Sequence, residues 1–502
     1  MTSLAASRLG LPLALFGAAL LFRALAFVPA VIDTDEGLYI LQAREWLSGT
    51  WPLIGVWDMH PIGAPALVAL AMLLPLDPVI AVRLLGAASV AATATALASL
   101  GRTLGLPAPV AAGAGLLSVA LSVLFGGLAT NTEILFAPFI VTALALAARE
   151  GVATLDRGEP PRAGPLVAVG LVAGIALTIK PVAFFEGCFA FAVAVGPAVL
   201  LREIAPARLL LLAGLYAAAA GAPTALIALA YLAQGALSVF VDVWFAAPFR
   251  YVGAAIALRD AGWMVVAALL FLAWPIVLAI AAVALRRREG SGRAVAFGIA
   301  WFATATLAVA APGMFFNHHF LVWLPPLALV AAAGAWAVAG LLAPHDRALV
   351  AGVLIALVAA DTWVTDAAKR IETGPGFRRA DPVRAIARNL SGTVPPGSTV
   401  WIVNYHPVVY VLADMAVPTR FAFPQHLAGW YSGVTGIDAD AEIDRVLASR
   451  PAAIVVDRGW WSAIRPPIRG VVEAALARDY AFAARVLEAN GPVEIYRLRG
   501  AP

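Results

Sequence analysis

The sequence predicts an α-helical polytopic membrane protein with a large first outer loop and a C-terminal α/β soluble domain. Composition is the first reason: 62% of the 502 residues are hydrophobic and 13% are charged, against about half and about a quarter in average soluble domains. Long apolar runs, which recur along the chain as far as residue 366, are the second. The third is a change after about residue 370, where charged residues and turn signals become frequent.

The apolar runs are the predicted membrane spans. A span needs about 20 mostly apolar residues, and the sequence contains about eleven such segments by that criterion. They are rich in Ala and Gly, which allow helices to approach closely in lipid. The segments cover residues 9–31, 78–100, 107–128, 132–149, 164–180, 182–202, 208–234, 262–285, 294–312, 318–342 and 347–366.

The loop between the first two spans, residues 32–77, is the longest of the predicted membrane domain, which covers residues 1–366. Within this loop, residues 61–75 are apolar but short and Pro-rich. We expect a helix lying at the membrane surface there rather than a further span.

Arginine in the short loops predicts the orientation. With the N-terminus in the cytoplasm, alternate loops carry the arginines and the opposite loops carry little net positive charge, as the positive-inside rule requires. We therefore expect a multi-pass protein of the cytoplasmic membrane with its C-terminal domain outside. The cytoplasmic residues would be Arg8, Arg102, Arg149, Arg157, Arg162, Arg202, Arg208, Arg286, Arg287, Arg288, Arg293 and Arg347.

Charge and cysteine content argue against a nucleic-acid-binding protein and against a disulfide-stabilised one. The net charge of +4 comes from loop arginines that set topology, so it does not indicate a nucleic-acid partner. The single cysteine, Cys188, lies in an apolar run and allows no internal disulfide.

The C-terminal segment, residues 367–502, has the pattern of a small extracytoplasmic α/β domain. Buried strands are expected at 399–403, 453–456 and 493–498, and helices at 382–390, 407–413, 440–448 and 466–478. It contains no catalytic motif, so it either covers a cavity, helps to bind an acceptor, or only stabilises the protein.

With this topology, ionisable residues from distant spans fall at the outer membrane face. Charge at membrane depth is costly unless it faces water or a partner, so we expect a single polar cavity at this face. The residues include Asp33, Asp35, Glu36, Asp58, His60, Arg83, Glu133, Lys180, Arg250, Arg259, His318 and His319.

The acids after the first span are the strongest candidates. In Asp33-Thr34-Asp35-Glu36, one residue can cap a surface helix that starts near Glu36, but capping does not require three acids. Asp35 and Glu36 would lie one helical turn before Tyr39.

Other polar residues each have a structural alternative. Asp58 and His60 follow Trp57 in a possible interfacial turn, and Arg83 either snorkels to the interface or faces the acids. Glu133 opens a span, where a helix dipole favours an acid. Lys180, the only lysine before the C-terminal domain, precedes Pro181 and can offer a point charge to phosphate. His318 and His319 are metal-ligand candidates, phosphate contacts or interfacial anchors.

The order of these motifs resembles one superfamily. An Asp35-Glu36-x-x-Tyr39 stretch, His60-Pro61 before a surface helix, Arg83 opening the second span and Gly174-x-x-x-Thr178-x-Lys180-Pro181 are similar to the membrane-embedded C-type glycosyltransferases. Within them, the chain resembles the branch of protein O-mannosyltransferases, aminoarabinose transferase and bacterial galacturonosyltransferases. A weaker likeness extends to Tyr410 and Pro418-Thr419-Arg420-Phe421.

The resemblance implies a glycosyltransferase that moves a hexose or pentose from a polyprenyl-phosphate donor to an acceptor hydroxyl on a glycan, lipid or protein. The reaction would take place outside, with inversion at the anomeric carbon. Asp35 would be the general base, and Glu36 would be a second catalytic residue. Lys180, Arg83, Arg250 and Arg259 would meet the donor phosphate; Tyr39, Asp58, His60, Glu133 and His318 would line the cavity. The sequence requires no cofactor; a divalent cation, if one is bound, would use Glu133 and His318.

Two readings from other classes stay open. Many spans with charges at membrane depth also fit a secondary transporter, although no internal repeat is detectable and the charges gather at one face. A flippase of lipid-linked sugars is the other reading, and it would tolerate the loss of Asp35.

Overall fold

The computed structural model describes residues 2–252, 256–289 and 291–500. The chain forms two compact units, each made of several segments. The first unit contains Met1–Ala24, Leu84–Gly235 and Ile256–Ala368; the second contains Leu25–Arg83, Ala236–Ala255 and Lys369–Pro502. The predicted boundary between residues 366 and 367 stays a prediction. The side chains of Arg8, Arg287 and Arg288 lie outside the described residues.

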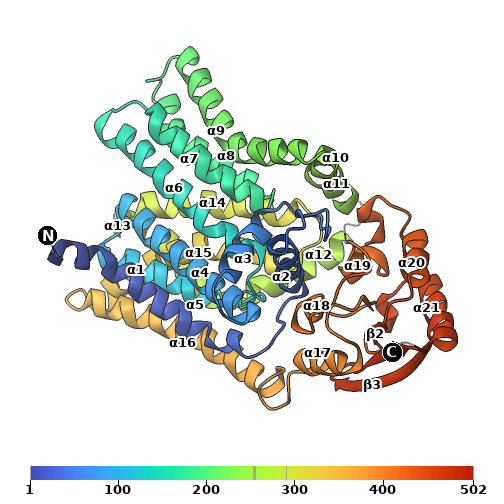
Figure 1. The fold of residues 1–502 in the computed structure, drawn as a ribbon. Coiled ribbons are helices and arrows are strands. Elements are labelled where there is room, and N and C mark those ends of the chain that lie inside the picture. Colours follow the sequence, from blue (N-terminus) through green and yellow to red (C-terminus); the bar gives the residue numbers. More distant parts are fainter. Residues whose placement is uncertain (1, 253–255, 290, 501–502) are drawn as a thin grey trace. The chain divides into compact units, whose positions relative to one another are not determined.

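The first unit is a bundle of helices (Figure 1). Its helices are α1 (Thr2–Phe22), α4 (Pro78–Thr103), α5 (Ala108–Leu121), α6 (Thr132–Arg157), α7 (Ala163–Ile179), α8 (Ala183–Leu200), α9 (Pro206–Ala233), α12 (Leu258–Phe271), α13 (Ala273–Glu289), α14 (Gly292–Ala310), the 3₁₀ segment η3 (Asn317–Trp323), α15 (Leu324–Leu342) and α16 (Arg347–Thr373). The first residues of α4 and the last of α16 belong to the second unit.

Each of the eleven predicted spans contains helix, but the span predicted at 107–128 ends early, because α5 ends at Leu121. Within the described residues, seven helices are long and apolar enough to cross a membrane, and α12 with α13, bent by 78° at their junction, forms either a broken span or a re-entrant loop. The break precedes Pro275, whose missing N–H removes a helical hydrogen bond. The polytopic helical class is confirmed, while the number of eleven crossings stays a prediction.

Three of the predicted spans are shorter apolar helices: Leu9–Phe22, Ala108–Leu121 and Ala163–Ile179. The predicted end of the first span at residue 31 is wrong, because α1 ends at Phe22. The next residue, Arg23, is fully buried, and its guanidinium donates to the carbonyl oxygens of Gly127 and Leu128.

Glycine allows α7 to pack directly on α9. A Cβ added at Gly170 would lie 2.7 Å from the Tyr216 carbonyl oxygen, and one at Gly174 would lie 2.4 Å from that of Ala220. Both distances are too short for any side chain, so this pair of helices depends on glycine at these positions. The close packing fixes α7, which ends at Ile179, one residue before Lys180.

The second unit contains the first loop and the C-terminal segment. Its elements are η1 (Ala24–Phe27), α2 (Thr34–Leu47), α3 (Gly63–Met72), α10 (Leu237–Val241), the π-helical η2 (Asp242–Ala246), α11 (Ala247–Val252), α17 (Pro382–Thr393), β1 (Val400–Ile402), α18 (Val408–Leu412), α19 (Pro424–Leu427), η4 (Ser432–Thr435), α20 (Ala439–Ala448), β2 (Ala453–Asp457), η5 (Trp461–Ala463), α21 (Pro466–Asp479), β3 (Tyr480–Glu488) and β4 (Gly491–Leu498). The helix expected within residues 61–75 is α3.

The C-terminal elements form a four-stranded sheet in the order β1-β2-β4-β3. β1 is parallel to β2, and β4 is antiparallel to both β2 and β3. The three predicted strands and four predicted helices are all present, which confirms the α/β class. β3 was not predicted.

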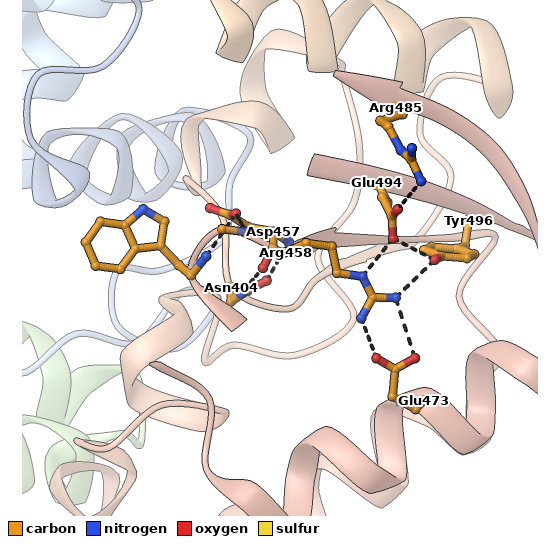
Figure 2. Close-up of polar contacts among 9 residues, drawn as sticks. Asn404, Asp457, Arg458, Glu473, Arg485, Glu494 and Tyr496 are labelled. Carbon is orange, nitrogen blue, oxygen red and sulfur yellow. Dashed lines mark hydrogen bonds and ion pairs between the residues drawn. The ribbon is translucent and has the colours of Figure 1, made fainter. Parts of the chain in front are cut away.

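Polar contacts hold the end of β2 (Figure 2). The Asn404 side chain exchanges two hydrogen bonds of 2.8 Å with the backbone of Asp457. Arg458 Nε donates to Glu494 at 2.7 Å, and its other nitrogens reach Glu473 and the Tyr496 hydroxyl. Arg458 therefore connects β2, α21 and β4.

Candidate functional site

The start of α2 holds the acids that the sequence singles out. Asp33 is the N-cap, and its side chain accepts a hydrogen bond of 3.1 Å from the backbone N–H of Asp35. Capping therefore accounts for Asp33, as expected for one of the three acids. Asp35 is partly exposed in the first turn of α2.

Glu36 points into the interior of the second unit. Its carboxylate lies 2.5 Å from Arg83 Nη1, and the side chains are 1% and 0% exposed. Of the two expectations for Arg83, snorkelling to the interface and facing the acids, the structure confirms the second. A buried ion pair of this kind fixes the helix that carries Asp35.

The His60 element packs beside the same helix. His60 Nδ1 lies 3.0 Å from Asp58 Oδ2, and the His60 ring meets Tyr39 edge-on at 6.4 Å between centroids. Burial alone would raise the pKa of the Asp58 carboxyl, but the charge of His60 and its hydrogen bond hold that pKa below the usual range. Asp58, Tyr39 and His60 thus form one connected group.

The C-terminal segment contributes to the start of α2 a residue that sequence reasoning missed. His406 is buried, and its Nδ1 lies 3.1 Å from the Thr34 hydroxyl, one residue before Asp35. Burial lowers the pKa of His406 to about 4, against the opposing charges of Asp33 and Asp381. His406-Pro407 repeats the His-Pro dipeptide of His60-Pro61. This repeat is the sequence signal by which His406 could have been found.

Further contacts bind α2 to the C-terminal segment. A Cβ at Gly37 would lie 3.1 Å from both the Cβ and the backbone nitrogen of Val408, so α2 and α18 pack closely. Arg44 donates to the carbonyl oxygens of Tyr410 and Met415 at 2.8 and 3.0 Å. The environment of Asp35 is therefore shaped by residues more than 360 positions away in the chain.

The first unit contains a second polar cluster. Lys180 Nζ lies 2.5 Å from Glu133 Oε1, with side-chain exposures of 7% and 1%. Pro181 disfavours helical backbone at the preceding residue, and Lys180 is extended at the C-terminus of α7. Glu133 lies in the first turn of α6. Both charges therefore lie where the helix dipoles favour them.

Two histidines of η3 complete this cluster. Ligand atoms of Glu133, His318 and His319 all lie within 4.8 Å of one another. These donor types suit zinc or a similar cation. However, Lys180 and the Thr132 hydroxyl already engage both Glu133 oxygens, at 2.5 and 3.0 Å. A cation at Glu133 would therefore compete with the Lys180 ammonium.

Asn131 was not among the predicted site residues. It is 2% exposed, and both polar atoms of its amide lack a hydrogen-bond partner among the described residues. Buried polar groups are normally bonded. The Asn131 amide, two residues from Glu133, is therefore available to bond a water or a ligand.

Arg250 and Arg259, the other two predicted phosphate ligands, lie in different units. Arg250 belongs to the second unit, where it donates to Asp242 Oδ1 and the Val434 carbonyl oxygen at 2.8 Å each. Arg259 is exposed on α12 of the first unit, and the described part of the chain offers it no ion partner. That all the predicted residues line one cavity stays a prediction.

The fold has known counterparts. ArnT from Cupriavidus metallidurans, solved with undecaprenyl phosphate bound, matches 98% of this chain and 99% of its own at a TM-score of 0.65 and 14% identity. This is the fold of the C-type membrane glycosyltransferases. The archaeal oligosaccharyltransferase AglB from Archaeoglobus fulgidus, solved with an inhibitory peptide and a dolichol-phosphate, matches 98% of this chain and 75% of its own, with a TM-score of 0.52 and 13% identity.

The same oligosaccharyltransferase in its apo form matches 99% of this chain and 75% of its own, with a TM-score of 0.51 and 13% identity. No model of a known protein family matches the sequence. Curated proteins provide no match either. The expected resemblance is therefore confirmed through the fold, which sequence identity alone would not reveal.

Proposed function

We propose that this protein is a membrane glycosyltransferase that transfers a sugar from a polyprenyl-phosphate donor to an acceptor hydroxyl. The observation that carries the proposal is the match of nearly the whole chain to ArnT, which was solved with a polyprenyl phosphate bound. The dolichol-phosphate in the AglB structure supports the same class of donor. The acceptor belongs to a glycan, a lipid or a protein.

Asp35 is the general base in this proposal. Asp33 serves as the cap, and Glu36 is buried against Arg83. Asp35 is partly exposed in the same turn, so it is the acid of this stretch that an acceptor hydroxyl can reach. Its carboxylate removes the proton of the acceptor hydroxyl as the oxygen attacks C1 of the sugar. The bond from C1 to the phosphate oxygen breaks, and the polyprenyl phosphate leaves with the electron pair. Attack opposite the leaving group inverts the anomeric carbon.

Lys180 is the residue that we assign to the donor phosphate. A fixed ammonium in a site of low dielectric stabilises charge that develops on a leaving group. The Glu133 carboxylate holds Lys180 at 2.5 Å, and the Asn131 amide offers further donors. Arg250 and Arg259 remain further candidates for this role. We assign the reaction to the outer face of the cytoplasmic membrane, following the distribution of arginine.

The test uses the full chain in proteoliposomes with a panel of labelled polyprenyl-phosphate sugars and membrane extracts as acceptors. Asp35→Asn should fold normally, and its transfer rate should be lower than that of the wild type by a factor of about 10²–10⁴. Asp444→Asn, which alters an exposed carboxylate of α20, is the matched control and should keep full activity. The anomeric configuration of the product, read by NMR, tests inversion.

Two results would overturn the proposal. Full transfer by Asp35→Asn would remove Asp35 as the base. Uptake of a labelled solute by the wild-type protein, with no transfer from any donor of the panel, would favour a transporter instead.

A further inference from the structure

An open cleft of about 440 Å³ lies in the second unit. It is lined by Ile54 and Gly55 of the first loop, by residues 417–421, and by Glu442 and Arg445 of α20. Its volume falls in the range of about 300–1,000 Å³ that is usual for sites that bind small molecules. None of the roles assigned above uses this cleft.

Arg420 stands out among the lining residues. Its guanidinium lies over the Phe421 ring, 4.9 Å from the centroid, and Phe421 in turn packs on Trp57 at 5.6 Å. The backbone is held as well, because the Arg420 carbonyl accepts a hydrogen bond of 2.8 Å from the Trp57 N–H. Arg420 is thus a partly buried cation in a fixed position.

The other charges around the cleft are already paired. Glu442 accepts from Arg445 Nη2 and Nε at 2.6 and 2.8 Å and from the Thr419 hydroxyl at 2.5 Å. Asp242, whose charge also reaches Arg420, bonds Arg250 at 2.8 Å.

Arg420 differs from these arginines. Across the described ranges, its side chain has no hydrogen bond and no ion pair. A guanidinium carries five donors in a rigid fork, and a planar oxyanion satisfies two of them at once.

We propose that this cleft binds an oxyanion, a phosphate or a carboxylate, through the Arg420 guanidinium. The lining charges sum to a positive excess, since Arg420 and Arg445 face the single carboxylate of Glu442. This step depends on the proposed function: because Lys180 is assigned to the donor phosphate, we assign the oxyanion of this cleft to the acceptor. The preferred acceptors are then acidic or phosphorylated glycans or lipids.

The binding test does not depend on transfer. Full-length protein in detergent is treated with phenylglyoxal, and modification of Arg420 is followed by peptide mass spectrometry. Arg388, exposed on α17, is the internal reference. Inorganic phosphate or glucuronate should slow the modification of Arg420 about tenfold relative to Arg388, whereas glucose and chloride at matched ionic strength should not.

The arms of this experiment separate the sources of the oxyanion. Protection by phosphate alone identifies a phosphorylated ligand, and protection by glucuronate alone identifies a carboxylate. The proposal is overturned if neither anion protects Arg420, or if glucose or chloride protects it equally.

Kinetics provide the second test. Arg420→Gln should raise the acceptor KM about tenfold or more, because a charge-assisted hydrogen bond is lost, with kcat and the donor KM unchanged. Arg388→Gln should change none of these constants. Unchanged acceptor KM in Arg420→Gln, beside inactive Asp35→Asn, would overturn this inference alone. Absence of transfer by the wild type would instead count against the proposed function, and the protection experiment would still decide the cleft.

Discussion

The Glu36 carboxylate and the Arg83 guanidinium lie 2.5 Å apart in the interior of the second unit, with almost no exposure of either side chain. One residue before Glu36 stands the proposed base, Asp35. The pair therefore connects the first turn of α2 to the first turns of α4, 47 residues later in the chain.

Breaking this pair should destabilise the protein. Arg83→Met leaves a buried carboxylate without its charge partner, which typically costs about 3–5 kcal/mol. The double variant Glu36→Leu with Arg83→Met should lose much less, because it removes both charges together. Thermal unfolding in detergent, followed by tryptophan fluorescence, measures the difference.

The half-exposed pair of Asp77 and Arg384, 3.0 Å apart, is the control. Its loss in Arg384→Met should cost about 0–1 kcal/mol. If Arg83→Met were as stable as Arg384→Met, the buried pair would not be holding α2 in place.

Gly37 should be sensitive to the smallest enlargement. Alanine normally stabilises a helix by up to about 1 kcal/mol relative to glycine, but here the new Cβ would press on Val408 at 3.1 Å. Overpacking costs about 1–3 kcal/mol, so Gly37→Ala should lower the melting temperature and the transfer rate. Gly214→Ala in α9, where no atom lies within 4 Å of the added Cβ, should be neutral or stabilising. Equal behaviour of the two variants would refute close packing of α2 on α18.

Four of the five α-helices described in the C-terminal segment, all but α19, could be predicted because each has an amphipathic or bounded apolar pattern, and three strands could be predicted from their buried runs. β3 could not. It follows α21 without a turn, and Ala481, Ala483 and Ala484 have low β-propensity. Its pairing with β4, not its own composition, makes it a strand.

The site shows the same limit. A cap at one of Asp33, Thr34 and Asp35 follows from local sequence, and the structure gives Asp33. The pairing of Arg83 with an acid was one of two expectations. The bond from Thr34 to His406 joins residues 372 positions apart, and no local pattern encodes it. Tertiary packing alone brings His406 to the start of α2.

Stability should fall as the pH is lowered from neutral. Burial lowers the pKa of His406 to about 4 and that of His426 to about 4, whereas an unfolded histidine has a pKa of about 6.5. Below about pH 6.5 these two histidines become protonated in the unfolded chain. In the folded chain they stay neutral down to about pH 4. The stabilisation present at neutral pH is therefore lost progressively across this window.

Unfolding midpoints between neutral pH and the lower end of this window measure the slope. His406→Gln and His426→Gln should each make it shallower, and His345→Gln, which alters an exposed histidine, should leave it unchanged. A slope that both buried-histidine variants retain would show that these side chains are not the groups that titrate.

The Glu133 and Lys180 pair predicts that transfer does not require a bound metal ion. The Lys180 ammonium already neutralises the Glu133 carboxylate, so a cation would have to share this carboxylate with a positive charge 2.5 Å away. Dialysis against a strong chelator should leave the transfer rate within about twofold, a change of less than about 0.5 kcal/mol.

Lys180→Met combined with Glu133→Gln should fold, because no lone buried charge remains, yet it should raise the donor KM. Asn131→Ala should raise it as well. Loss of activity on chelation, restored by zinc, would instead assign Glu133, His318 and His319 to a metal and Lys180 to holding the empty site.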